Sequence, residues 1–359
     1  MKEWIYSPRF DGFFILGPAF FITLLVFLIP GFSKVGSEVP LWAWVLFVML
    51  IDVSHVYSTL YRTYFDKDEF DERKMLYTLA PLICFISGVF IYSISSLLFW
   101  SILAYVAVYH FVRQQYGFMM IYLRKGKNKS TFSAYVDKLL IYWATIYPLV
   151  YWHTHPRKFS WFMEGDFLYF DAPLVSKLCG LFYLALIIIY LCKESCFSFK
   201  LRNVNYPKNL LLLGTMLSWY TGIVLYNGDM SFTLINVVSH GIPYMALIWV
   251  YGNLKWKKKN LEDPPWISKI FTPSYALIFI ALLCGFAFIE EAFWDILVWR
   301  ERPQLFFSWF NMSAVKDSQL LNILVPLLAL PQATHYVVDG FIWRLAKPAG
   351  AMKKVMDGQ

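Results

Sequence analysis

Long apolar stretches alternate with short polar segments along almost the whole chain. About 20 consecutive apolar residues suffice for a helix to cross the hydrocarbon core of a bilayer. The pattern therefore predicts an all-α, polytopic integral membrane bundle that forms a single transmembrane domain over residues 1–359. The ten predicted helices cover residues 11–30, 41–61, 75–92, 95–123, 132–152, 174–192, 208–227, 231–252, 273–299 and 319–343.

Basic residues fall in alternate loops, after the second, fourth, sixth and eighth predicted helices, and in the C-terminal tail. Cytoplasmic loops of membrane proteins carry an excess of lysine and arginine, so both termini are predicted to be cytoplasmic. We expect a bacterial-type inner membrane. The loop residues are Arg62, Lys67, Arg73, Lys74; Arg124, Lys125, Lys127, Lys129; Lys193, Lys200, Arg202, Lys208; and Lys255, Lys257, Lys258, Lys259, Lys269.

The composition agrees with a membrane protein. Of 359 residues, 58% are hydrophobic and 16% are charged, whereas soluble domains carry about 25% charged residues. The net charge of +8 resides in the short loops, so it indicates membrane topology and not a nucleic-acid partner. No small-residue cleavage site follows the first apolar stretch, so we expect no cleavable signal peptide. The five cysteines form no CxxC pair and are expected to be free thiols.

Four of the six histidines lie inside predicted helices, each on a different helix: His55, His110, His240 and His335. All four helices run from the outer to the inner side, and each histidine lies in the middle or the cytoplasmic half. Ionisable residues within a membrane are costly and usually mark a functional site. One such histidine alone is often only an interhelical hydrogen bond, but four at similar depth favour a shared site.

Each of these histidines also belongs to a polar stripe along its own helix. Residues three or four positions apart share one helix face, and such faces should turn toward one another or toward water. The stripes are Asp52, His55, Thr59 and Arg62; His110, Arg113, Gln114 and Gly117; Asn236, His240 and Tyr244; and His335 with Asp339.

This arrangement is typical of a metal site. Neutral imidazole binds iron, zinc and copper, and an acceptor one turn away can fix its tautomer. His55, His110, His240 and His335 are the predicted ligands. Asp52, Asp339 and Asn236 are the predicted acceptors, although either aspartate could instead bind the metal directly. Arg113, Gln114 and Tyr244 are expected to shape the substrate side, where Arg113 could also offset carboxylate charge or hold an anionic substrate group.

Two further groups of polar residues are weaker candidates for a functional site. His153 and His155, in the sequence WHTHP, could bind metal but are expected at the outer end of a helix, where exposed histidines are common. Glu290, Glu291 and Asp295 lie in the outer half of the ninth helix. They could line a vestibule, but pairing with Arg300 or Arg302 is the favoured interpretation.

The absence of several motifs excludes some classes of enzyme and cofactor. The sequence has no histidine boxes of membrane desaturases, no HExxH, no nucleotide-binding glycine loop, no GxSxG and no CxxCH. Haem b remains an alternative, because it needs only axial histidines. A proton-coupled transporter is another, since intramembrane His, Asp and Arg form proton relays. Gly241–Pro243 and Pro331 could break two helices, as in many carriers.

Four dispersed histidines in a helical bundle resemble the Brp/Blh type of carotenoid-cleaving membrane oxygenase. The resemblance is one of architecture and composition and rests on His55, His110, His240 and His335; that family's local histidine motifs are not matched. It implies one non-haem iron and an apolar polyene cleaved with O₂.

We therefore expect a metal-dependent membrane enzyme, an iron oxygenase acting on a lipophilic substrate that enters from the bilayer. A zinc hydrolase is the second choice.

Overall fold

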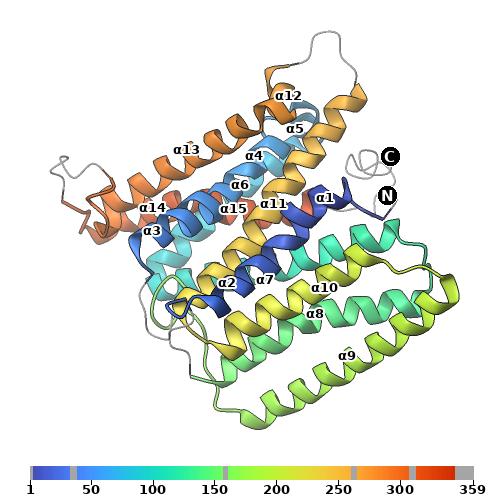
Figure 1. Ribbon diagram of the computed structural model, residues 1–359. Coiled ribbons are helices and arrows are strands. Elements are labelled where there is room, and N and C mark those ends of the chain that lie inside the picture. The colour runs from blue at the N-terminus through green and yellow to red at the C-terminus, as the bar shows by residue number, and fades with distance from the viewer. Residues whose placement is uncertain (1–2, 33–38, 157–160, 260–264, 307–312, 344–359) are drawn as a thin grey trace. The chain divides into compact units, whose positions relative to one another are not determined.

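The computed structural model of the protein describes residues 3–32, 39–156, 161–259, 265–306 and 313–343. These residues form helices joined by short connections, and no strand occurs among them. Figure 1 shows the course of the chain. The prediction of an all-α protein is confirmed for this part of the sequence.

The chain divides into two compact units. Unit 1 comprises Met1–Pro40 and Val108–Pro243, and unit 2 comprises Leu41–Ala107 and Tyr244–Gln359. Two of the three divisions fall inside long helices, α7 (Ser96–Lys125) and α11 (Asp229–Lys259), and the third falls between Pro40 and Leu41. Each unit is therefore built from segments that are distant in sequence.

Unit 1 contains α1 (Pro8–Phe10), the π-helix η1 (Asp11–Leu16), α2 (Gly17–Leu28), α8 (Thr131–Thr154), α9 (Pro173–Leu201), α10 (Tyr206–Trp219) and the π-helix η3 (Tyr220–Leu225). Helix α8 packs against both α9 and α10, and α10 packs against α2 (Figure 1). The helix starts carry polar caps: Ser130 accepts from the Ser133 N–H, and Asn205 accepts from the Lys208 N–H. Such caps satisfy N–H groups that have no partner in the first turn.

Unit 2 contains α3 (Leu41–Ala43), the π-helix η2 (Trp44–Val53), α4 (Ser54–Arg62), α5 (Lys67–Glu72), α6 (Lys74–Ile94), α12 (Trp266–Ile270), the 3₁₀ turn η4 (Pro273–Tyr275), α13 (Ala276–Trp294), the π-helix η5 (Asp295–Trp299), α14 (Ser318–Leu328) and α15 (Leu330–Ile342). Helix α6 packs on α14 and α15, and α13 packs on η2 and α4. Helix α15 also contacts α4, which carries the first histidine of interest.

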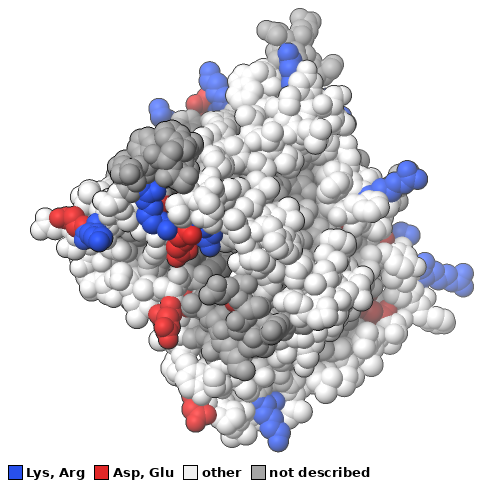
Figure 2. All heavy atoms as spheres, turned by 60° about the vertical axis from the view of Figure 1, so that its left-hand side comes forward, with Lys and Arg blue, Asp and Glu red and all other residues white. Residues whose placement is uncertain are grey.

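Seven helices among the described residues are long and apolar enough to cross a membrane, and the bent pair α14 and α15 would make an eighth. They include α9, whose Leu178, Leu181, Leu184 and Ile188 are all more than half exposed. Exposed apolar surface of this kind is typical of helices that face lipid. Figure 2 shows a face on which most atoms belong to uncharged residues. The segments predicted at 132–152 and 208–227 are helical but are not among these seven, so the number of ten spans and the cytoplasmic termini stay predictions.

The two expected helix breaks behave differently. Helix α11 continues through Gly241–Pro243 as one helix. The tenth predicted helix is divided into α14 and α15, which meet at an angle of 41°. Pro331 lies at the start of α15, where a proline is tolerated because the first N–H groups of a helix have no carbonyl partner.

Candidate metal centre

In unit 1, His110 of α7 and His240 of α11 face each other. Their Nε2 atoms are 3.2 Å apart, and both side chains are buried. The ring of Phe111 packs on His240 with centroids 3.9 Å apart, which restricts the orientation of that imidazole. At 3.2 Å, either one ring donates a hydrogen bond to the other or both direct their lone pairs toward a shared ion.

Gln114 lies one turn after His110 on α7 and is also buried. Its Nε2 donates to the backbone carbonyl of His240 at 3.0 Å. This contact assigns the amide orientation, because only nitrogen can donate to a carbonyl. The other amide atom, Oε1, has no hydrogen-bond partner among the described residues, so it leaves a free acceptor beside the histidine pair.

In unit 2, His55 of α4 and His335 of α15 form a second pair. Their ring centroids are 5.0 Å apart and the ring planes are nearly perpendicular. Tyr244 of α11 packs edge-on against both, with centroids 5.7 Å from His55 and 5.1 Å from His335. All three side chains are buried. The π-helix η2 ends at Val53, directly before α4, and π-turns are frequent near functional sites.

The two histidines of unit 2 have different partners. Oδ1 of Asp52 lies 3.4 Å from Nδ1 of His55, but the two atoms form no hydrogen bond, so the role of Asp52 as the acceptor of this ring stays a prediction. His335 meets Thr59, whose Oγ1 is 2.6 Å from Nδ1. Asp339, the partner expected from helix spacing, instead accepts hydrogen bonds from Tyr244 at 2.7 Å and from the Trp343 indole.

The four histidines form one group. One ligand nitrogen from each of His55, His110, His240 and His335 lies within 4.8 Å of the others, and all four residues are buried. Imidazole nitrogens bind a transition metal at about 2.0–2.1 Å, so two ligands of one ion are separated by roughly 3.0–4.2 Å. The limit of 4.8 Å is slightly longer than this range, so the group could hold a metal ion if the nitrogens moved together by up to roughly 0.6 Å.

Two other predicted site residues have partners within unit 1. Arg113 is exposed; its guanidinium donates to the Tyr142 hydroxyl of α8 at 2.5 Å and lies over the Tyr116 ring. Asn236 donates to the carbonyl of Phe232 one turn earlier on α11. These contacts leave the proposed roles of both residues as predictions.

His153 and His155 contact backbone carbonyls one turn earlier in the chain. The Nδ1 atoms of His153 and His155 lie 2.7 and 2.9 Å from the carbonyls of Leu149 and Tyr151. Within the ranges that the structure describes, neither belongs to a group that could hold a metal. The five cysteines are free, as expected.

Of the acidic residues predicted on the ninth helix, Asp295 has a clear structural partner. Asp295 accepts from the backbone N–H of Arg302 at 2.7 Å and so holds the chain as it leaves η5. The Arg302 guanidinium pairs with Glu301 at 3.0 Å and lies over the Trp44 ring. Asp295 thus meets the backbone of Arg302 rather than its side chain.

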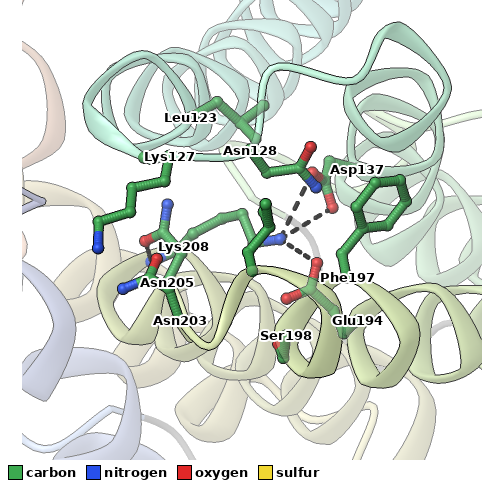
Figure 3. Close-up of a pocket in the computed structure, with 12 residues that line it drawn as sticks. Leu123, Lys127, Asn128, Asp137, Glu194, Phe197, Ser198, Asn203, Asn205 and Lys208 are labelled. Carbon is green, nitrogen blue, oxygen red and sulfur yellow. Dashed lines mark hydrogen bonds and ion pairs between the residues drawn. The ribbon is translucent and has the colours of Figure 1, made fainter.

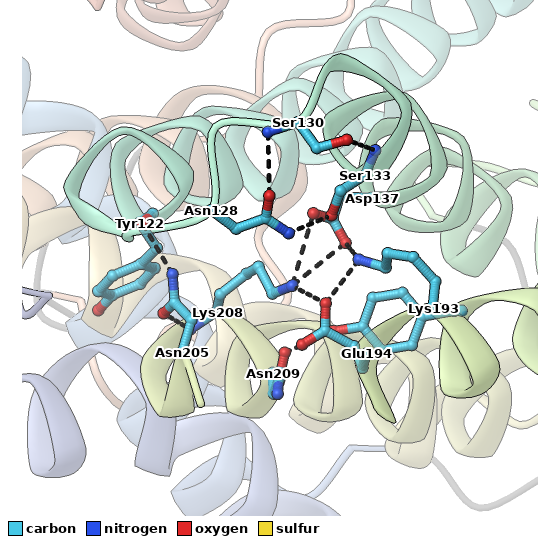
Figure 4. A network of polar contacts seen from close by, with 11 residues as sticks. Tyr122, Asn128, Ser130, Ser133, Asp137, Lys193, Glu194, Asn205, Lys208 and Asn209 are labelled. Atoms are coloured by element: carbon cyan, nitrogen blue, oxygen red, sulfur yellow. Dashed lines mark hydrogen bonds and ion pairs between the residues drawn. The ribbon is translucent and has the colours of Figure 1, made fainter. Parts of the chain in front are cut away.

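A second polar cluster lies in unit 1, where α8, α9 and α10 meet. Asp137 of α8 binds Lys193 of α9 at 2.5 Å and Lys208 of α10 at 3.3 Å. Glu194 binds both lysines as well. Figure 4 shows the four side chains converging from the three helices. All but Glu194 are buried, and two positive charges balance two negative ones.

A small pocket opens beside this cluster (Figure 3). Its polar lining includes Asn128 and Asn205, which already bind Ser133 and the Tyr122 carbonyl respectively. Since the charges satisfy one another and these amides hold the adjoining loops, we assign the cluster a structural role in joining α8, α9 and α10.

Comparisons of the chain with protein-family models, with curated proteins and with solved structures found no match.

Proposed function

We propose that the protein is a membrane-embedded, metal-dependent enzyme, and that His55, His110, His240 and His335 hold one metal ion. The observation that carries the proposal is the position of four buried imidazoles whose ligand nitrogens lie within 4.8 Å of one another. A bound cation would accept a lone pair from one nitrogen of each of the four rings.

The donor set favours iron for an enzyme. Imidazole suits iron, zinc, copper and nickel. Zinc is most often four-coordinate, and its catalytic sites keep one position open, so four histidine ligands would leave zinc no position for chemistry. A six-coordinate iron would keep two positions. Zinc with an activated water, as in a hydrolase, would require one of the four histidines to leave the ion.

The spacing also favours a bare ion over haem. A porphyrin fills the four equatorial positions of its iron and leaves only two axial ones for protein ligands. Four imidazole nitrogens within 4.8 Å of one another leave no room for the macrocycle between them. The pair of histidines in each unit therefore supports a single shared ion more than two haems.

We further propose an iron oxygenase whose substrate is lipophilic and enters from the bilayer. The apolar exposed helices and the aromatic rings of Phe111 and Tyr244 beside the histidines would suit such a molecule. The resemblance to carotenoid-cleaving oxygenases would imply an apolar polyene. When bound, the iron would supply O₂ activation, and the free Oε1 of Gln114 would accept a hydrogen bond from a water or from a polar end of the substrate.

Metal analysis of the detergent-purified protein tests the proposal. The wild type, His240→Ala and His153→Ala would be expressed together and analysed for iron, zinc and copper. His153 provides a matched control because it lies in unit 1 outside the four-histidine group. We expect about one metal ion per chain in the wild type and in His153→Ala, and loss of most of it in His240→Ala.

Wild-type protein that carries no more metal than His240→Ala, even after reconstitution with ferrous iron, would overturn the proposal. Metal-free protein that drives pH-dependent solute uptake into vesicles would instead favour the proton-coupled transporter.

A further inference from the structure

A continuous chain of hydrogen bonds runs from His335 to Asp339 through two other helices. Nδ1 of His335 lies 2.6 Å from Oγ1 of Thr59, and Oγ1 lies 3.0 Å from the hydroxyl of Tyr244. That hydroxyl donates to Asp339 at 2.7 Å. The four groups come from α4, α11 and α15 within unit 2, and all are buried.

The acceptor at the end sets the direction of the whole chain. Asp339 receives the Tyr244 hydroxyl and the Trp343 indole on the same oxygen, as an acceptor-only carboxylate does. Each hydroxyl has a single proton. Since Tyr244 gives its proton to Asp339, its oxygen must accept from Thr59, and Thr59 must in turn accept from His335. His335 therefore carries its proton on Nδ1 and presents the lone pair of Nε2.

We propose that Thr59 is a positioning residue that fixes the tautomer of His335 for metal binding, and that Asp339 acts on this ligand only through Tyr244 and Thr59. The inference rests on the proposed metal site. It assigns a role to the hydroxyl of Thr59, and it gives the hydroxyl of Tyr244 a task in addition to the contact of its ring with the substrate.

The two histidines of unit 2 would then differ in how strongly they donate to a metal ion. His55 has the carboxylate of Asp52 3.4 Å from Nδ1 without a hydrogen bond to it, and a negative charge at this distance would raise the basicity of the ligand. His335 has a neutral hydroxyl instead, with the negative charge two hydrogen bonds away. We expect His335 to be the weaker donor of the pair and the one whose binding depends most on hydrogen-bond direction.

The test compares metal affinity across matched variants of the full-length protein. Thr59→Val has the shape of threonine but no hydroxyl, and Thr59→Ser keeps the hydroxyl. Metal would be removed with a chelator, and Co²⁺ would be added back in competition with a dye of known affinity. The Co²⁺ absorption bands would report the ligand field directly.

We expect Thr59→Val to weaken Co²⁺ binding by about 10–100-fold, the range seen when partners of ligand histidines are removed. Thr59→Ser should stay within about threefold of the wild type and keep its absorption bands. Tyr244→Phe, which removes the acceptor of the Thr59 proton, should weaken binding to an intermediate degree. This second variant keeps the test decisive if Thr59→Val does not fold.

Equal affinity in the wild type, Thr59→Val and Tyr244→Phe would overturn the inference and leave the metal site intact. Equal loss in Thr59→Val and Thr59→Ser would also overturn it, because the variant that keeps the hydroxyl would then bind metal no better than the variant that lacks it. If the wild type itself bound no Co²⁺, the proposed function would fail first.

Discussion

The Nε2 atoms of His110 and His240 lie 3.2 Å apart, although the two residues are separated by 130 positions in the sequence. Each reaches this position from the interior of a long, unbroken helix, α7 or α11. Side chains on helices are held more precisely than side chains on loops. The two helices therefore hold the rings where both nitrogens could bind one metal ion.

A shared ion predicts strongly non-additive mutations at this pair. His110→Ala and His240→Ala should each remove most of the metal, and the double variant should do no worse than either single one, because residues that act as one unit are not additive. Metal content by mass spectrometry checks this. Two partial losses that multiply in the double variant would argue for independent roles.

Asp52 should support the ligand role of His55. Its carboxylate lies 3.4 Å from Nδ1, so Asp52→Ala should weaken metal binding by roughly 10–100-fold. Asp52→Asn keeps an oxygen acceptor and should lie between the wild type and Asp52→Ala. Chelator competition gives the affinities. An Asp52→Ala variant that binds metal as tightly as the wild type would exclude this role.

The cluster of Asp137, Lys193, Glu194 and Lys208 should contribute to stability and not to metal binding. Removing one member of a buried ion pair leaves an uncompensated charge and costs about 3–5 kcal/mol. We therefore expect Asp137→Ala to lower the free energy of unfolding by that amount while its metal content per folded chain stays unchanged. Thermal or denaturant unfolding in detergent measures the loss.

Lys127 provides the matched control for this cluster, because it is exposed at the rim of the same pocket. Lys127→Ala should change the free energy of unfolding by no more than about 0.5 kcal/mol. An Asp137→Ala variant as stable as Lys127→Ala would show that the cluster is dispensable for the fold.

The carboxylate of Glu69 on the short helix α5 should make the folded protein less stable in acid. Burial tends to raise the pKa of Glu69, but the Arg62 guanidinium 2.6 Å away and the Tyr77 hydroxyl lower it below the ordinary value of 4.5. The unfolded chain then binds the proton more readily than the folded one. The stabilisation is present in full above pH 4.5 and disappears as the pH falls through the lowered pKa.

The unfolding temperature of the wild type should therefore drop as the pH decreases below about 4.5. Glu69→Gln should be less stable at neutral pH, since it leaves Arg62 buried without its carboxylate, and its stability should change less in acid. Parallel acid profiles of the two proteins would contradict this assignment.

The sequence predicts the helices well because each apolar stretch carries its own signal. It also identifies the four histidines, since an ionisable residue inside an apolar helix is conspicuous. Spacing along one helix correctly places Asp52 near His55, three positions apart, but it does not predict whether the two side chains form a hydrogen bond. It fails to identify the partner of His335, because Thr59 and Tyr244 come from other helices, and contacts between helices leave no trace in the spacing of either one.

The polar stripe of α4 nevertheless includes the residue that contacts His335. Thr59 lies one turn after His55 on the same face, which the packing of α15 against α4 turns toward His335. The π-helical segments were beyond prediction, because the sequence of η2 is as apolar as that of an ordinary α-helix.

That segment has a consequence for how the chain can tolerate insertions and deletions. Residues Trp44–Val53 wind more loosely than an α-helix and end two positions before His55. Losing one residue there would tighten a wide turn to α-helical winding, so the change could be absorbed within η2. His55 would keep its neighbours on α4, and the residues before η2 would keep the face that they present. The loss of a single codon in this segment could thus leave the position of His55 unchanged.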